Sequence, residues 1–144
     1  MPASNFTMFN SFLEALGRKV HNLNSGDVIK IMLVNSVPAL SAAVKADLTE
    51  ISPGFGYSAG GISIGTHDYT QASGIAKFTI AADPVITASG GNIGPFLCPV
   101  LYNDSATNKE LIGFWQYPAN QTIYDGEPLT IDVNQSSGLF TIGG

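Results

Sequence analysis

The chain has 144 residues, with six Lys and Arg, eleven Asp and Glu, a net charge of −5 and one cysteine. This length is typical of one domain, and a single cysteine excludes an intrachain disulfide. The excess of acidic residues argues against a nucleic-acid partner, because binding to phosphates depends on clustered Lys and Arg. No apolar run approaches the roughly 18 residues that cross a bilayer, so we expect no membrane partner.

The chain also carries unusually little charge. Charged residues make up 12% of it, and its mean hydropathy is +0.19. Average soluble domains are about 25% charged. Because contiguous apolar surface on a soluble chain usually marks contact with another protein, we expect an obligate assembly.

The first residues contain no charge. Residues 1–8 have neither a basic region nor an apolar core of the signal-peptide type, so we predict no secretory signal. Pro2, Phe6 and Met8 lie in this segment, and we interpret it as an N-terminal arm. Residues 9–144 then form a single domain.

Apolar residues recur at helical spacing just after this arm. They predict one N-terminal amphipathic helix over residues 9–23, with Ser11 and Glu14 as a possible capping box and Gly26 beyond the end. A second, short helix is predicted over residues 41–51. The apolar residues of the first helix are Phe9, Phe12, Leu13, Leu16, Val20 and Leu23.

The remaining pattern is that of strands. Residues 28–34 form a nearly continuous apolar run, which is typical of a strand covered on both faces. From Ser52 onward, Gly, Pro, Asn and Ser separate short β-like runs at 61–66, 75–81, 85–88, 93–101, 111–117, 129–133 and 139–142. This spacing predicts a mainly β fold, an antiparallel β-sandwich of jelly-roll type.

The runs 93–101 and 111–117 are the most apolar pair in this region. We predict that they form a buried hairpin, with residues 103–109 as its exposed tip. Cys98 lies in the first of these runs, where a free thiol behaves as a small apolar side chain.

Few residues carry chemistry. His67 and Asp68 are the only adjacent acid–base pair, and we interpret them as a surface or turn dipeptide, with a hydrolase that uses them as the alternative. Two histidines and one cysteine show no metal-ligand spacing. We therefore predict no enzyme activity, no metal and no cofactor.

Three other groups of residues resemble binding sites. The glycines of 54–61 do not precede a helix, so a nucleotide-binding loop is disfavoured. Asn103, Asp104 and Asn108 supply too few carboxylates for a calcium loop. Trp115 and Tyr117 are candidates for a sugar-binding surface, although their apolar setting favours a place in the core.

The chain resembles a group of small structural proteins encoded by tailed bacteriophages, the head decoration or cement proteins. The resemblance covers residues 9–133 and rests on three segments in a fixed order. They are FNSFLEALGRKVHNLNSGDVIKIMLVNS, DLTEISPGFGYSAGGISI and ITASGGNIGPFLCPVLYNDSATNKELIGFWQYPANQTIYDGEPLTID.

The resemblance implies a β-sandwich subunit, made in the host cytoplasm, that binds the outside of an expanded capsid. Its implied partners are the major capsid protein and two further copies of itself in a homotrimer. The interface residues that we predict for this role are Pro2, Phe6, Met8, Asn103, Asp104 and Asn108. The alternative is a tail or fibre protein of the same virion, with a receptor-binding role.

Overall fold

The computed structural model describes residues 5–143 and is mainly β, with antiparallel pairing between all its strands. This part of the chain contains short helical segments, α1 (Phe12–Gly17) and a 3₁₀ turn, η1 (Lys45–Asp47). The strands are β1 (Thr7–Met8), β2 (Ile29–Val34), β3 (Ile62–Ser63), β4 (His67–Ala72), β5 (Ile75–Ile80), β6 (Val85–Thr87), β7 (Ile93–Phe96), β8 (Cys98–Asn103), β9 (Leu111–Phe114), β10 (Gln121–Ile123), β11 (Pro128–Thr130) and β12 (Phe140–Gly143).

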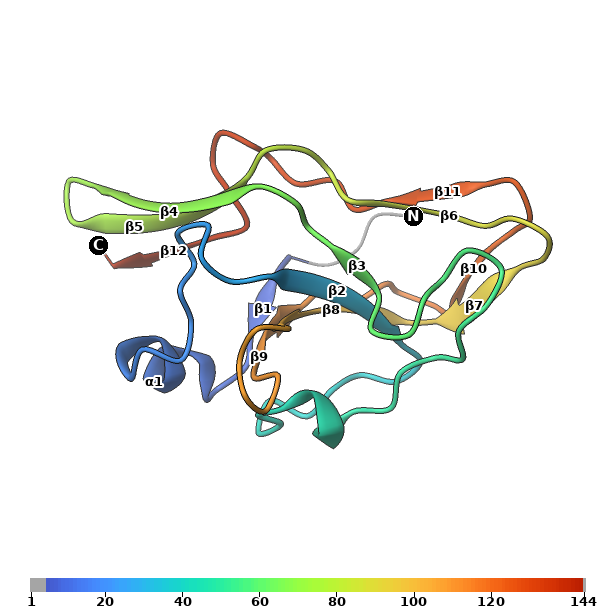
Figure 1. Ribbon diagram of the computed structural model, residues 1–144, viewed down its shortest axis with the longest axis horizontal. Helices are drawn as coiled ribbons and strands as arrows, with labels where there is room; N and C mark the ends of the chain where they lie inside the picture. Colours follow the sequence, from blue (N-terminus) through green and yellow to red (C-terminus); the bar gives the residue numbers. More distant parts are fainter. Residues whose placement is uncertain (1–4, 144) are drawn as a thin grey trace.

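A five-stranded sheet in the order β1-β9-β8-β2-β3 occupies the middle of the molecule (Figure 1). The three-stranded sheet β12-β5-β4 extends toward one end, and the two-stranded ribbons β10-β7 and β11-β6 lie toward the other. The prediction of a mainly β fold is confirmed, with several antiparallel sheets.

Both faces of the central sheet are buried. Along β2, Ile29 and Ile31 belong to one core cluster, and Met32 and Val34 belong to another. The side chains of β8 and β9 alternate between the same two clusters, as successive residues of a strand must. The predicted strand at 28–34, covered on both sides, is therefore confirmed over Ile29–Val34, while Val28 lies outside it and is exposed.

Different segments cover the two faces. Phe78 of β5 and Phe140 of β12 pack on the Ile31 face, with their ring centroids 5.4 Å apart. Phe96 of β7 belongs to a third cluster toward the ribbon end. Phe9 and Ala42 cover the Met32 face, so residues before β2 and after it close that side.

The predicted hairpin is confirmed as β8 and β9. Val100 pairs with Phe114 and Leu101 pairs with Gly113. The run 93–101 is nevertheless two strands, because the chain leaves the pairing with β10 after Phe96 and enters the central sheet at Cys98.

The N-terminal helix is much shorter than predicted. It spans residues 12–17 instead of 9–23, and Lys19 adopts a left-handed conformation with φ of 68° directly after it. Phe9 continues the pairing of β1 with β9, because its N–H donates to the carbonyl of Ile112 at 3.1 Å. Phe9 packs in the cluster on one face of the sheet, whereas Phe12 and Leu23 pack in the cluster on the other.

The second predicted helix is reduced to the 3₁₀ turn η1. The carboxylate of Asp47 accepts hydrogen bonds from the backbone N–H groups of Ala43 and Val44, at 2.9 and 3.2 Å. Leu48 is already extended, and Val44 forms an isolated bridge with Glu110. The side chain of Asp47 thus caps the N–H groups that open a single turn, and the chain is extended again from Leu48.

Cys98 is buried, as predicted, and its removal from water raises the pKa of its thiol to about 11. Only the thiolate attacks disulfide reagents. We therefore expect native protein to react with Ellman's reagent at least about a hundredfold more slowly than protein unfolded in guanidinium chloride at the same pH. Similar rates in the two states would contradict a packed thiol.

Candidate functional site

The described part of the predicted arm belongs to the body of the protein. Thr7 and Met8 form β1 and pair with β9. The ring of Phe6 lies 4.9 Å from that of Trp115 and 5.7 Å from that of Phe140. Phe6 and Met8 therefore pack on the core of their own chain, and Pro2 lies outside the described residues.

The end of β8 and the loop that follows it, residues 103–109, bring together the other three predicted interface residues. Asn103 ends β8, Asp104 follows it, and Asn108 lies near the start of β9. This loop is hereafter called the β8–β9 loop. No contact in the described structure joins these three residues to Phe6 or Met8.

Asn103 is fully buried and does not lie at an exposed tip, contrary to the prediction. Its side-chain Nδ2 donates to Asp27 Oδ2 at 2.6 Å and to His21 Nδ1 at 3.1 Å. Its Oδ1 accepts the backbone N–H groups of Ser105 and Ala106. All four hydrogen-bonding positions of this amide are filled, so Asn103 fixes the start of the β8–β9 loop to the segment before β2.

His21 completes this buried group in its neutral form. Burial lowers the pKa of His21, although the charges of Glu110 and Asp27 raise it. Since Nδ1 accepts from Asn103, the proton lies on Nε2, which has no hydrogen-bond partner in the described structure. The group is therefore suited to holding the loop, because its remaining polar atom is not presented to solvent.

Asp104 lies between two lysines. Its carboxylate is 2.9 Å from Lys109 Nζ and 3.3 Å from Lys30 Nζ. The hydrogen bond from Lys109 lowers the pKa of Asp104, burial opposes this, and Lys30 lowers it further. The two ion pairs stabilise the fold above the ordinary aspartate pKa, and this contribution is lost as the pH falls through the lowered value.

Replacing Lys109 by Met removes the larger of these effects. We expect the pKa of Asp104, followed by carboxyl NMR titration, to rise toward the ordinary aspartate value. Stability at neutral pH should fall by less than about 1 kcal/mol, because exposed ion pairs contribute little. Lys19→Met is the matched control and should leave the Asp104 titration unchanged. An unaltered titration in Lys109→Met would contradict this assignment.

Asn108 is exposed and borders a shallow groove of about 670 Å³. Val44, Ala46 and Leu48 supply apolar lining on one side, and Thr107 lies on the other. The two lysines of the groove are paired, Lys45 with Glu50 and Lys109 with Asp104. A shallow groove with compensated charge is suited to contact with another protein surface.

The glycine-rich segment 54–61 is held by Glu50. Glu50 Oε2 accepts from the hydroxyl of Tyr57 at 2.6 Å and from the N–H of Gly60 at 2.7 Å. The same hydroxyl accepts from the N–H of Leu33 in β2. Burial and the hydrogen bond to Glu50 raise the pKa of Tyr57, so its phenol stays protonated. This arrangement anchors the loop, and the N–H groups of Gly54, Tyr57 and Gly61 are bonded to carbonyl groups within the segment.

The prediction that His67 and Asp68 form a surface or turn dipeptide is wrong for His67, which is buried, and for the turn, which is a strand. They begin strand β4, and His67 is buried, with its ring nitrogens 2.7 and 2.8 Å from the carbonyl oxygens of Leu23 and Asp27. Asp68 is exposed and accepts from the N–H of Tyr69 at 2.9 Å. Because alternate residues of a strand face opposite ways, the two side chains do not form an acid–base pair.

The exposed aromatic side chains are not the two candidates for a sugar-binding surface, Trp115 and Tyr117. Trp115 and Tyr117 are each only 8% exposed, so neither presents a flat ring to a sugar. Phe55 is 55% exposed and Tyr124 is 58% exposed. The glycines on both sides of Phe55 were the one sequence signal for an exposed loop residue at this place.

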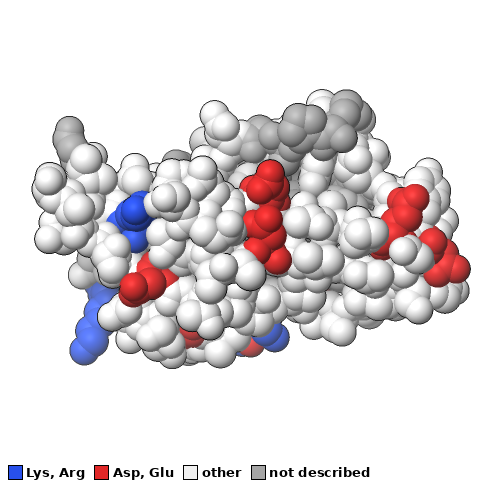
Figure 2. All heavy atoms as spheres, turned by 90° about the horizontal axis from the view of Figure 1, so that it is seen from above, with Lys and Arg blue, Asp and Glu red and all other residues white. Residues whose placement is uncertain are grey.

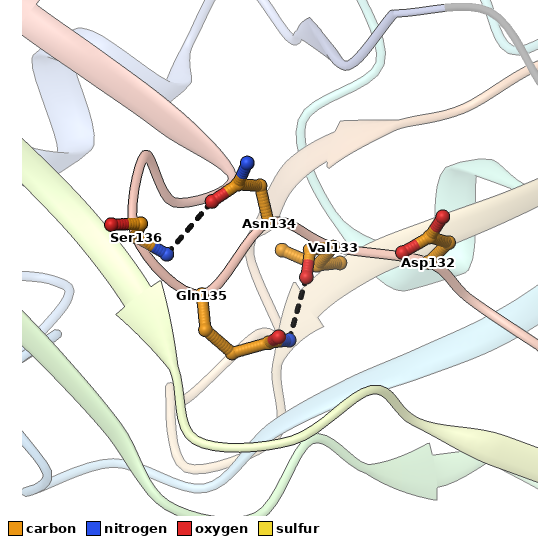
Figure 3. A pocket seen from close by; sticks show the side chains of 5 residues that line it. All are labelled: Asp132, Val133, Asn134, Gln135 and Ser136. Carbon is orange, nitrogen blue, oxygen red and sulfur yellow. Dashed lines mark hydrogen bonds between the residues drawn. The ribbon is translucent and has the colours of Figure 1, made fainter.

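A second depression, of about 600 Å³, lies over residues 132–136 (Figure 3). Asn134 Oδ1 accepts from the N–H of Ser136, and Gln135 Nε2 donates to the carbonyl of Val133. These polar groups therefore hold the loop itself. Asp132 points away from them and has no hydrogen bond or ion pair in the described structure.

No group of His, Cys, Asp and Glu side chains among residues 5–143 is arranged to hold a metal ion. No helix in the same range has the length and apolar character of a membrane span. No family model matches the chain, and neither a curated protein nor a solved structure is significantly similar to it.

Proposed function

We propose that the chain is a decoration protein of a tailed bacteriophage, a homotrimeric subunit that binds the outside of the expanded capsid and stabilises it. The observation that carries the proposal is the surface of the chain. With half the usual charge, it also exposes large apolar side chains on several elements. They are Leu13, Val28, Val37, Leu40, Phe55, Ile75, Val85 and Tyr124.

The resemblance of residues 9–133 to cement proteins suggests which partners this surface contacts, namely further copies of the chain and a capsid shell. In such a subunit the fold is a β-sandwich of jelly-roll type, whose layers are the central sheet and the strands packed on its Ile31 face. Exposed apolar residues on several faces suit a subunit that contacts both its copies and the shell.

The mechanism requires no chemistry. A protein that binds only the expanded lattice stabilises it by mass action. A trimer that touches several shell subunits at once multiplies weak contacts through effective concentration. The anchored β8–β9 loop fits this role, since a loop that is already ordered loses little entropy on binding.

The proposal is tested with purified protein and undecorated heads of the phage that encodes it. We expect sedimentation to give the mass of a trimer, and we expect the trimer to bind expanded heads to saturation and to raise the temperature at which they break. A monomer that does not sediment with expanded heads would overturn the proposal.

A second candidate function is receptor binding at the tail or fibre of the same virion. The exposed ring of Phe55 borders a cavity of about 360 Å³, which is also lined by Ile51, Asn92 and Pro95. An aromatic ring beside a small pocket is typical of a ligand-binding surface. This function predicts that Phe55→Ala abolishes binding of whole phage to host cells while heads remain stable.

A further inference from the structure

The ribbon formed by β6 and β11 has one uncharged, solvent-facing side. Val85 pairs with Thr130, and Thr87 pairs with Pro128. These four residues are exposed, and Val85 is 48% exposed, whereas Ile86 of β6 is buried in the core. The outward side of this short ribbon therefore carries only apolar and β-branched side chains.

Two free carboxylates bracket this strip along β11. Glu127 directly precedes the strand, and Asp132 follows it by two residues. Both are exposed, and neither has a side-chain hydrogen bond or ion pair in the described structure. Five residues of extended chain place their Cα atoms roughly 17 Å apart.

Basic residues are missing from this end of the chain. Lys109 is the only Lys or Arg after Lys77. The ammonium of Lys77 donates to the carbonyl of Ser136 at 2.7 Å, so it is not bound to either carboxylate. Figure 2, seen from above, shows one group of acidic side chains near the middle and another toward the right-hand end, with uncharged atoms between them; a further acidic group lies to the left, beside Lys and Arg atoms.

We infer that this side of the β6–β11 ribbon is a docking surface for a protein surface that has an apolar centre and basic side chains on both sides of it. Charge complementarity selects this occupant, because two unpaired carboxylates favour cations and disfavour an identical acidic face. The inference deepens the proposed function and rests on it for the partner, which is then the outer surface of the capsid shell.

Backbone packing makes the surface rigid. The N–H of Ala88 donates to the carbonyl of Glu127 at 3.0 Å, and the N–H of Ile131 donates to the carbonyl of Pro84 at 2.9 Å. The hydrogen bonding of the ribbon thus extends past both ends of β11. The two carboxylates are held on a fixed frame on either side of the apolar strip, as a surface that recognises one geometry requires.

The test compares two ribbon variants with matched controls. Glu127→Lys/Asp132→Lys reverses the charge at both ends of the apolar strip, and Val85→Glu puts a negative charge in the middle of the strip. Asp68→Lys/Glu14→Lys, on β4 and α1, makes the same double charge reversal at exposed positions elsewhere. Thr70→Glu on β4 puts a charge on an exposed β-branched residue of another strand. Circular dichroism and urea titration first establish that each variant is folded.

Two probes are used with every variant. One is undecorated heads, and the other is a labelled peptide with a lysine at each end and Val and Thr between them. We expect each ribbon variant to weaken binding to heads by at least about tenfold, the controls to change it by less than about twofold, and added salt to weaken wild-type binding.

The outcomes separate this inference from the proposed function. Equal binding of all variants to heads overturns the docking surface and leaves the decoration role intact. If no variant binds heads but the peptide binds wild type and not the ribbon variants, the surface is supported and the decoration role fails. If neither probe distinguishes the ribbon variants from wild type, the inference is overturned. It is also overturned if the ribbon variants abolish only the self-association of the chain.

Discussion

Replacement of Gly61 by Ala is expected to be among the most damaging single substitutions in this chain. Gly61 has a φ of +81°, and a Cβ built on it would fall on the carbonyl oxygen of Ile31. The left-handed backbone alone costs an alanine about 1–2 kcal/mol. The overlap with β2 must be relieved by moving the backbone, so we expect a total loss of about 4 kcal/mol in the free energy of unfolding.

Gly65→Ala is the matched control for this prediction. Gly65 has a φ of +76°, and no atom lies within 4 Å of the position that a Cβ would occupy. It should therefore lose only the backbone contribution. Urea unfolding of the two variants at the same pH measures the difference, and equal losses would show that close packing against Ile31 does not matter.

Loss of the Asn103 amide is expected to cost about 3 kcal/mol. Asn103→Ala leaves Asp27 and His21 without their shared donor and frees the N–H groups of Ser105 and Ala106 in a partly buried loop. Buried polar groups that lose a partner cost about 1–3 kcal/mol each, although some of these groups will gain water.

Two variants sharpen the Asn103 prediction. Asn103→Asp keeps the shape but sets a carboxylate against that of Asp27, so it should destabilise at least as much as alanine. Asn108→Ala, on the same loop but exposed, should change stability by less than about 0.5 kcal/mol. Urea unfolding followed by circular dichroism supplies all three values. An unchanged free energy of unfolding in Asn103→Asp would contradict the hydrogen-bond assignment.

The strand pattern was predictable wherever burial set the hydropathy. The runs at 28–34 and 111–117 are apolar mainly because their central parts, β2 (Ile29–Val34) and β9 (Leu111–Phe114), are enclosed on both faces of the central sheet. Strand β4, with the sequence HDYTQA, was missed because most of its residues are exposed at the edge of a sheet. Ser73 and Gly74 both have positive φ, as in a two-residue hairpin turn, but that signal is weak without an apolar strand before it.

The helix over residues 9–23 was overpredicted for a related reason. Apolar residues at helical spacing are also produced by a chain that leaves a strand, makes one turn and a half of helix and then crosses the core as a loop. Phe9 and Phe12 lie on opposite faces of the central sheet, which no single helix face can achieve.

The candidate site was only partly predictable. Sequence placed Asn103, Asp104 and Asn108 in one polar loop, and this is correct for Asp104 and Asn108, whereas Asn103 is the last residue of β8. It gave no sign that Asn103 is the buried member, because its partners His21 and Asp27 are more than 70 residues away in the chain. The two carboxylates beside the β6–β11 ribbon could not be predicted either. Glu127 and Asp132 are recognised as neighbours of one apolar strip only when the structure shows that β11 lies between them.

The central proposal, that this chain decorates a phage capsid, is tested most directly by electron cryomicroscopy of purified virions that contain it. Heads made with and without the protein supply the comparison. The account predicts trimeric density on the outer surface of the expanded shell that is lost when the gene is deleted. Density for this chain on the tail or fibre, with an unchanged shell, would contradict it.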